Sequence, residues 1–244
     1  MKNIDHSARR NAVLVKTISR YIKDAEPVSS QDMSRSFNLS SATIRNIFSE
    51  LEDAGYLTHP YTSGGRIPTQ KGYRFYVNYL ADQMELLDAD KESISSRLKK
   101  GTGQIDEILD VTSNLVSQIT HYASIVSDLE RQDRFLYKGL SFILAQPEFH
   151  DAKRIRLLIK LLEEKQKFLE IINQDFEKKI NILIGEELEC REIEDCSLVV
   201  STYYIKDKPL GRLAVLGPTR MEYGHIIPTL EYASDVLSIT LKDI

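Results

Sequence analysis

The stretch SSATIRN (residues 40–46) places hydroxyl, guanidinium and amide groups at the start of an apolar-patterned segment. At about 100° per residue, Ile44, Ile47, Phe48 and Leu51 share one helical arc, which predicts that they pack on a domain core. The opposite arc is polar or small. Arginine can fork onto guanine, asparagine can pair with adenine, and alanine or threonine can contact a thymine methyl. The candidate DNA-binding residues of this helix are Ser41, Ala42, Thr43, Arg45, Asn46 and Ser49. The alternative is an ordinary solvated face.

The neighbouring elements favour DNA binding. Residues 7–24 have the apolar spacing of a helix, and Pro27 stops it. A short helix over 30–37 can be capped by Ser29 or Ser30, and Ser40 or Ser41 can cap the third helix, which Gly55 ends. YLTHPYTSGGRIP then alternates apolar and polar residues around Ser63-Gly64-Gly65, which is typical of a hairpin. This order of elements predicts a winged helix-turn-helix.

Basic residues follow the tip of the predicted wing. Arg66 comes directly after the two glycines, and Lys71 and Arg74 lie just beyond it. They are candidates to reach a minor groove or the phosphates. An arginine in a hairpin often only faces water, so the alternative stays open. Residues 1–80 hold 11 Lys and Arg against 7 Asp and Glu, whereas the whole chain holds 32 against 36. A basic first third suits a polyanionic partner.

The middle of the chain is predicted to be helical. A helix from Thr69 runs on through ADQMELLDAD, and KKGTGQ (99–104) is the expected linker. Residues 105–129 repeat apolar positions at spacings of three and four, as in a heptad seam. Such a stripe is most often intramolecular core, and a dimer contact is the alternative. The candidate dimer residues are Ile108, Leu115, Ile119, Tyr122 and Val126.

The last part of the chain mixes helices and strands. A long amphipathic helix is expected from Pro147 to Phe176. INILIG, CSLVVSTYYI and LGRLAVLGP are rich in β-branched residues and predict strands, with KDKP as a hairpin turn. A final helix covers about 224–241. In GPTRMEY (217–223), Thr219 and Arg220 can hold an anion at a strand-to-helix junction, or Arg220 can form a structural salt bridge, which is the favoured alternative.

Composition argues against several classes of protein. Cys190 and Cys196 are the two cysteines, and the five histidines form no metal-binding pattern, so neither a metal nor another cofactor is expected. No phosphate-cradling glycine loop and no nucleophile–base arrangement is evident, so an enzyme is not expected. No apolar run reaches the roughly 20 residues of a membrane span, and the start is unlike a signal peptide. We expect a cytoplasmic protein without membrane contact.

Several motifs resemble one known family. EPVSS, SSATIRNIFSELEDAGYLTHPYTSGGRIPTQKGYRFYVNYL, PEFHD, IGEE, SLV and LGRLAVLGPTRMEYGHII are similar to the heat-inducible transcription repressors of the HrcA family. The resemblance covers both ends of the chain. It implies a repressor of chaperone genes that binds an inverted-repeat operator in double-stranded DNA. It also implies a GAF-like C-terminal domain and activity that depends on the GroEL chaperonin.

The chain departs from this family in its middle. Where the family carries the start of the GAF-like domain and an inserted dimerisation segment, only SDLERQD (127–133) is present. Tyr61 stands where the family commonly has histidine. Because an inverted repeat needs two recognition helices, we still expect a homodimer. The expected fold is α+β and helix-rich: a winged helix-turn-helix (1–80), a linker with amphipathic helices (81–134) and a shortened GAF-like domain with an antiparallel sheet (135–244).

Overall fold

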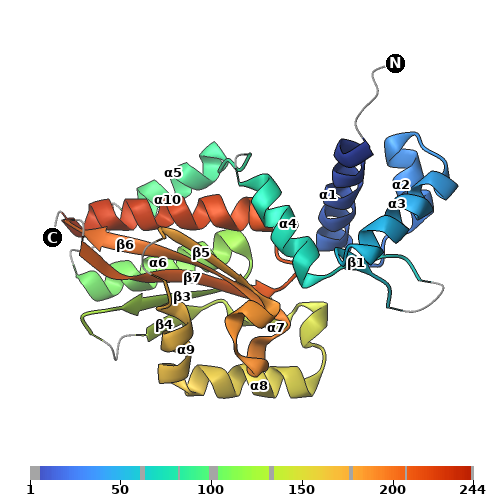
Figure 1. Cartoon of the computed structure of the whole chain (residues 1–244). Coiled ribbons are helices and arrows are strands. Elements are labelled where there is room, and N and C mark those ends of the chain that lie inside the picture. The colour runs from blue at the N-terminus through green and yellow to red at the C-terminus, as the bar shows by residue number, and fades with distance from the viewer. Residues whose placement is uncertain are drawn as a thin grey trace. The chain divides into compact units, whose positions relative to one another are not determined.

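The computed structural model describes residues 6–60, 64–81, 83–98, 104–131, 135–175, 178–206 and 208–242. The chain divides into two compact units, an N-terminal unit (1–83) and a C-terminal unit (84–244). Each is described by itself (Figure 1). Three predicted features lie outside the described residues. They are the tip of the wing around Ser63, Tyr61, which stands where the family commonly has histidine, and most of the linker (99–103).

In its described residues, the N-terminal unit has three helices, a two-stranded hairpin and a fourth helix. Its elements are α1 (His6–Asp24), α2 (Ser30–Phe37), α3 (Ser41–Asp53), β1 (Leu57–Thr58), β2 (Ile67–Pro68) and α4 (Gln70–Leu80). β1 and β2 pair antiparallel, with Leu57 opposite Pro68. The winged helix-turn-helix prediction is confirmed, and α2 has the predicted bounds.

Local signals explain these boundaries. The Ser29 hydroxyl accepts a hydrogen bond from the backbone of Asp32, and the Ser40 hydroxyl accepts one from the backbone of Thr43, so each serine caps its helix. After α3, Gly55 adopts φ +76°, a left-handed conformation that glycine tolerates best. α4 ends at Leu80, and the next helix begins at Asp88, so the predicted continuous helix is wrong.

The part of the C-terminal unit that the structure describes is a five-stranded antiparallel sheet with helices on both faces. The strands are β3 (Ala123–Asp128), β4 (Phe135–Lys138), β5 (Ile180–Ile184), β6 (Cys196–Ile205) and β7 (Lys208–Pro218), in the spatial order β4-β3-β7-β6-β5. The helices are α5 (Asp88–Leu98), α6 (Ile105–Thr120), α7 (Leu140–Leu144), α8 (Ala152–Glu163), α9 (Lys165–Ile172) and α10 (Tyr223–Lys242), with short 3₁₀ turns at Pro147–Phe149, Gly185–Leu188 and Arg191–Ile193. Strands β5, β6 and β7 and helix α10 confirm the sequence prediction.

The two sheet faces have separate cores because side chains alternate along each strand. On one face, Ile125, Val200 and Ala214 join a cluster of buried residues from α7, α8 and α9. On the other face, α10 packs on β6 and β7, and α6 packs on β3 and β4. Figure 1 shows α8 and α9 on one side of the sheet and α10 on the other.

The predicted helical stripe over 105–129 is wrong in its second half. α6 ends at Thr120, because His121 adopts φ 56°, and residues 123–128 form β3 in the middle of the sheet. All six residues of β3 are buried, so the strand lacks the polar alternation that distinguishes a strand from a helix.

Burial also decides the role of the candidate dimer residues. Ile108, Leu115, Tyr122 and Val126 are buried in the C-terminal unit, and Ile119 is half-buried. They are intramolecular core, so the dimer alternative gains no support. The single long helix predicted after Pro147 is also wrong: that segment holds a 3₁₀ turn, α8, which Asp151 caps, and α9.

Candidate nucleic-acid interface

Helix α3 separates an apolar face from a polar face, as predicted. Ile44, Ile47, Phe48 and Leu51 are at most 3% exposed and form its inner side. The outer side of its first half consists of exposed residues, with Ser41 and Thr43 half-buried beside them. The exposed set is Ala42, Arg45, Asn46 and Ser49. This half of α3 therefore offers donors and acceptors to a partner outside the chain.

The hydroxyls at the start of α3 serve the fold. Thr43 Oγ1 lies 2.9 Å from the Ser40 hydroxyl, and the Ser41 hydroxyl donates to that of Ser34 on α2 at 3.4 Å. Arg45 has one hydrogen bond with the described residues, from Nε to the Ser41 carbonyl at 3.3 Å. The terminal nitrogens of Arg45 are thus available for a base or a phosphate.

A cavity of about 390 Å³ lies between α2, α3 and the wing. Arg45 lines it from α3 and Arg66 from the wing, and Ser29 and Ser30 line it from the start of α2. Two guanidinium groups beside a helix N-terminus favour an anion. The Ser29 hydroxyl and Arg20 lower the pKa of the Asp32 carboxyl in the first turn of α2.

Arg66 is held inside the N-terminal unit. Its backbone exchanges two hydrogen bonds of 2.9 Å with Val28, and its Nη2 lies 2.8 Å from Glu52 Oε2. The other oxygen of Glu52 accepts a hydrogen bond from His59 Nδ1 at 2.7 Å. Glu52 on α3 therefore joins both arms of the wing, and we call Glu52, His59 and Arg66 the wing clamp. A minor-groove role for Arg66 would compete with this clamp.

The other two predicted wing cations differ in their surroundings. Lys71 Nζ donates to the Ala54 carbonyl at 2.8 Å and lies 4.7 Å from the centre of the Tyr56 ring. It neutralises the C-terminal end of α3, which is a structural role. Arg74 on α4 is half-buried.

Sequence reasoning missed Glu52 and His59. Their side chains meet across the turn between α3 and the wing, and Arg66 reaches Glu52 from fourteen positions along the chain. The spacing of these residues in the sequence does not predict the contact, because the geometry of the hairpin brings them together. The sequence offered one hint of the contact: Glu52 is an acidic residue on a helix that was predicted to face DNA.

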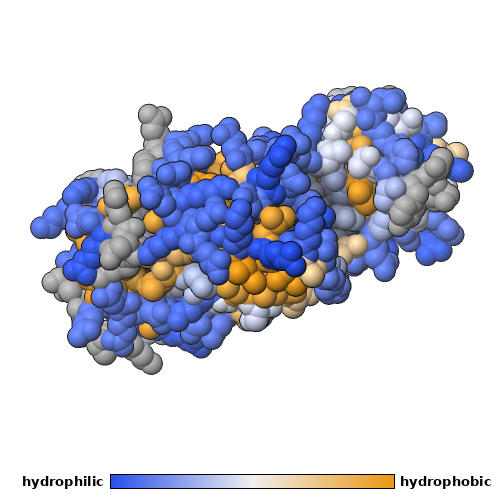
Figure 2. Space-filling view, turned by 90° about the horizontal axis from the view of Figure 1, so that it is seen from below, coloured by the Kyte–Doolittle hydropathy of each residue, from blue (hydrophilic) through white to orange (hydrophobic). Residues whose placement is uncertain are grey.

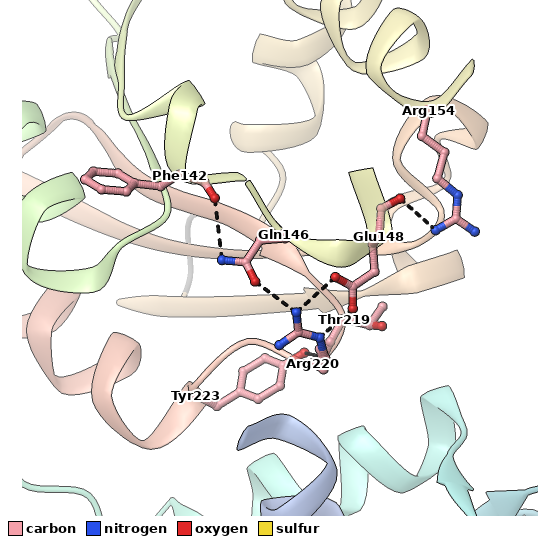
Figure 3. A network of polar contacts seen from close by, with 7 residues as sticks. All are labelled: Phe142, Gln146, Glu148, Arg154, Thr219, Arg220 and Tyr223. Atoms are coloured by element: carbon pink, nitrogen blue, oxygen red, sulfur yellow. Dashed lines mark hydrogen bonds and ion pairs between the residues drawn. The ribbon is translucent and has the colours of Figure 1, made fainter. Parts of the chain in front are cut away.

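In the C-terminal unit, Arg220 forms the predicted salt bridge (Figure 3). Its Nε donates to Glu148 Oε1 at 2.5 Å, and its Nη2 donates to Glu148 Oε2 at 3.1 Å and to Gln146 Oε1 at 2.9 Å. The Tyr223 hydroxyl donates to the Thr219 carbonyl at 2.7 Å. Arg220 is only 7% exposed, so the structural alternative is confirmed, and the anion-binding alternative gains no support.

Other kinds of site receive no support from the described part of the chain. Within those residues, no group of three or more His, Cys, Asp and Glu side chains is placed to hold a metal ion. None of the described helices combines the length and apolarity that crossing a bilayer requires.

The fold and the outer face of α3 define a winged helix-turn-helix protein of the DNA-binding class. Residues 5–80 match the family model described as "Winged helix-turn-helix transcription repressor, HrcA DNA-binding". Residues 76–227 match the model described as "HrcA protein C terminal domain". The chain belongs to the HrcA family of transcription repressors, and it is a DNA-binding repressor.

Curated relatives agree over nearly the whole chain. A heat-inducible transcription repressor HrcA from Desulforamulus reducens is 28% identical over 337 positions, covering 97% of each chain. One from Symbiobacterium thermophilum is 28% identical over 331 positions, covering 94% of this chain and 97% of the relative. Because these alignments are longer than the 244-residue chain, the chain is a shortened member.

A crystal structure described as that of a hypothetical protein has a similar fold. The two chains superpose with a TM-score of 0.84 at 21% identity, covering 96% of this chain and 98% of the other.

Proposed function

We propose that the first half of α3 reads base edges in the major groove of an operator. The observation that carries this proposal is the exposed outer face of α3, opposite an inner face that is at most 3% exposed. Arg45 is the candidate for a bidentate contact with guanine, and Asn46 for a contact with adenine. Ala42, Thr43 and Ser49 border them, and Ser41 lies at the start of the helix.

The cavity beside α3 is the proposed seat of a backbone phosphate. The guanidinium groups of Arg45 and Arg66 and the N-terminal end of α2 supply positive potential there. Lys71 and Arg74 on α4 do not line this cavity, and Lys71 is held at the C-terminal end of α3. Phosphate contacts fix the register of the protein on the duplex, whereas α3 selects the sequence.

The family membership and the names of the relatives support a finer proposal. The relatives are named heat-inducible transcription repressors. We propose that this chain represses heat-shock genes in the cytoplasm as a homodimer on an inverted repeat, and that its activity depends on the GroEL chaperonin. A two-fold dimer supplies one recognition helix to each half-site.

A gel-shift experiment tests the DNA-binding proposal. The full chain is titrated onto an inverted-repeat operator and onto a scrambled duplex at several salt concentrations. Arg45→Ala should cost about 1–3 kcal/mol on the operator and little on the scrambled duplex, if Arg45 contacts a base. Arg191→Ala removes the same charge from an exposed position of the C-terminal unit and should leave binding unchanged. An equal loss on both duplexes would make Arg45 a phosphate contact.

The chaperonin proposal has a separate test. Operator occupancy is measured after mild heating and cooling, with and without GroEL and ATP. Higher occupancy with the chaperonin is expected, because it would return unfolded repressor to the binding state. Equal occupancy in both samples would remove GroEL from the proposed function and leave DNA binding intact.

A further inference from the structure

The Arg66 guanidinium lines the cavity beside α3 with only part of its hydrogen-bonding capacity used. Its Nη2 lies 2.8 Å from Glu52 Oε2, and its Nη1 donates to the Gly64 carbonyl at 3.3 Å. Its Nε is buried and has no hydrogen-bond partner among the described residues. A buried N–H group without an acceptor is unfavourable, so an anion in the cavity would supply what this guanidinium lacks.

Glu52 contacts Arg66 from outside the cavity. Of the described residues that line the cavity, Arg45 and Arg66 are the charged ones, and Glu52 is not among them. Glu52 follows Arg45 on α3 by seven residues, which places the two on the same side of the helix, two turns apart. A phosphate in the cavity and the Glu52 carboxylate would therefore compete for the same guanidinium.

His59 gives Glu52 a second partner. His59 Nδ1 lies 2.7 Å from Glu52 Oε1, the oxygen that the Arg66 ion pair does not use. The Glu52 side chain is only 19% exposed, so a carboxylate without any partner there would be unfavourable. Because the contact with His59 does not depend on Arg66, the guanidinium can leave Glu52 while the carboxylate stays paired.

The surface around this ion pair suits a charged partner. Figure 2 views the N-terminal unit, at the right, from the side on which β1 lies in Figure 1, and hydrophilic residues predominate on that face. The Arg66 side chain is 24% exposed, so a phosphate can reach it while the wing stays folded.

We propose that Glu52 is a positioning residue that makes the phosphate contact of Arg66 conditional. In the free protein and on a random duplex, Arg66 stays paired with Glu52. On the operator, the base contacts of α3 fix a phosphate in the cavity, and Arg66 exchanges Glu52 for that phosphate. The inference rests on the proposed function, because it needs both the base contacts of α3 and the phosphate seat.

The salt dependence of DNA binding tests the proposal, because its slope counts phosphate contacts, which a purely structural residue does not change. Gel shifts of the full chain compare an inverted-repeat operator with a scrambled duplex at several salt concentrations. Arg66→Ala should reduce the slope by about 1 on the operator and leave it unchanged on the scrambled duplex. An equal reduction on both duplexes overturns the conditional contact.

Glu52→Gln should have its clearest effect on the scrambled duplex. The substitution keeps the size of the side chain and removes its charge, which frees Arg66 for any phosphate. The slope on the scrambled duplex should steepen by about 1, and the affinity should rise about threefold to tenfold. On the operator the affinity should rise without a change of slope, because Arg66 already contacts a phosphate there.

Two comparisons assign this effect to Arg66. In an Arg66→Ala background, Glu52→Gln should leave the affinity for the scrambled duplex within about twofold. Glu50→Gln is the matched control, because Glu50 lies on the same helix and faces His6 at 3.6 Å. Its slope on the scrambled duplex should equal that of the wild type. Thermal melting checks that all variants fold.

The inference and the proposed function fail in different ways. If Glu52→Gln leaves the slope on the scrambled duplex unchanged, or steepens it even without Arg66, the role of Glu52 is overturned. Preference of the wild type for the operator in the same gel shifts would still uphold the DNA-binding proposal. A wild type that binds both duplexes equally refutes the proposed function and the inference with it.

Discussion

Arg45 of the N-terminal unit and the buried arginines of the C-terminal unit have opposite surroundings. In the N-terminal unit, Arg45 is exposed and has one hydrogen bond with the described residues. In the C-terminal unit, Arg220 is paired with Glu148, and Arg212 is fully buried. Arg212 donates to the Thr202 hydroxyl and to the carbonyls of Gln174 and Asp175, just after α9. Residue type therefore does not define a binding site, whereas exposure and local partners do.

Arg66 stands between these extremes. Its side chain is 24% exposed, and it lines the cavity next to Arg45 while the wing clamp holds it. Such an arginine can support the wing, contact a phosphate or do both. Substitutions can therefore test the contrast between exposed arginines and arginines that are paired within the chain. The first concerns the most buried ion pair, Arg220 with Glu148.

Removal of Glu148 should have the largest effect. Glu148→Ala leaves the buried Arg220 with an uncompensated charge, which should lower the free energy of unfolding by about 3–5 kcal/mol. Urea denaturation measures it, and Glu163→Ala, at an exposed position, should change stability by less than about 0.5 kcal/mol. A second substitution, Arg220→Met, should restore part of the loss. If Glu148→Ala cost no more than the control, Arg220 would not depend on its partner.

Gly65 tests how tightly the wing is seated. A Cβ there would lie 2.7 Å from the carbonyl carbon and oxygen of Pro27, which are backbone atoms and cannot rotate away. Gly65→Ala should shift the wing, break the pairing of Val28 with Arg66 and cost about 1–3 kcal/mol of stability. Operator affinity should fall with it. Thermal melting and gel shifts measure both, and unchanged binding would mean that the wing does not contact DNA.

The wing clamp can be separated from phosphate binding by a double-mutant cycle. Glu52→Gln removes the charge between His59 and Arg66, and we expect less than about 1 kcal/mol of lost stability. If Arg66 acts only through the clamp, then Glu52→Gln, Arg66→Ala and the double variant should bind operator equally. If Arg66 also contacts a phosphate, Arg66→Ala alone should reduce the salt slope by about 1.

The smallest effect is expected at a partly exposed ion pair of the C-terminal unit. Hydrogen bonds from Lys167 Nζ and from the Cys190 thiol lower the pKa of Glu192 to about 2, from the usual 4.5. A lowered pKa stabilises the fold above pH 4.5, and this contribution is lost as the pH falls from 4.5 towards 2.

Solvent limits the size of this effect. The Lys167 side chain is 40% exposed, so we expect less than about 1 kcal/mol. Denaturation at pH 6 and pH 3 should show a smaller change with pH in Glu192→Gln than in the wild type. Identical pH dependence in both proteins would contradict the prediction.

Elements with strong local signals could be predicted from the sequence. Serine caps fixed α2 and α3, and runs of β-branched residues marked β6 and β7. β3 could not be recognised, because both of its faces are buried. The break between α8 and α9 at Glu164 lies where neither proline nor glycine stands.

The candidate site divides in the same way. The outer face of α3 follows from helical spacing, and exposure confirms its geometry at Arg45 and Asn46. The wing clamp depends on where the hairpin places His59 and Arg66 relative to Glu52, which is a tertiary property. The pairing of Arg220 was predicted, but its partner Glu148 lies 72 positions away and could not be.

Helix α10 has a consequence for the order in which the molecule is made. It contributes many buried side chains to the C-terminal unit and packs on β6, β7, α5 and α6, yet it begins only at Tyr223. A ribosome working from the N-terminus therefore releases the complete DNA-reading unit well over a hundred residues before this helix emerges. During that interval α10 does not yet cover one face of the nascent sheet. A chaperone that holds unfinished chains would then find the most apolar surface to bind.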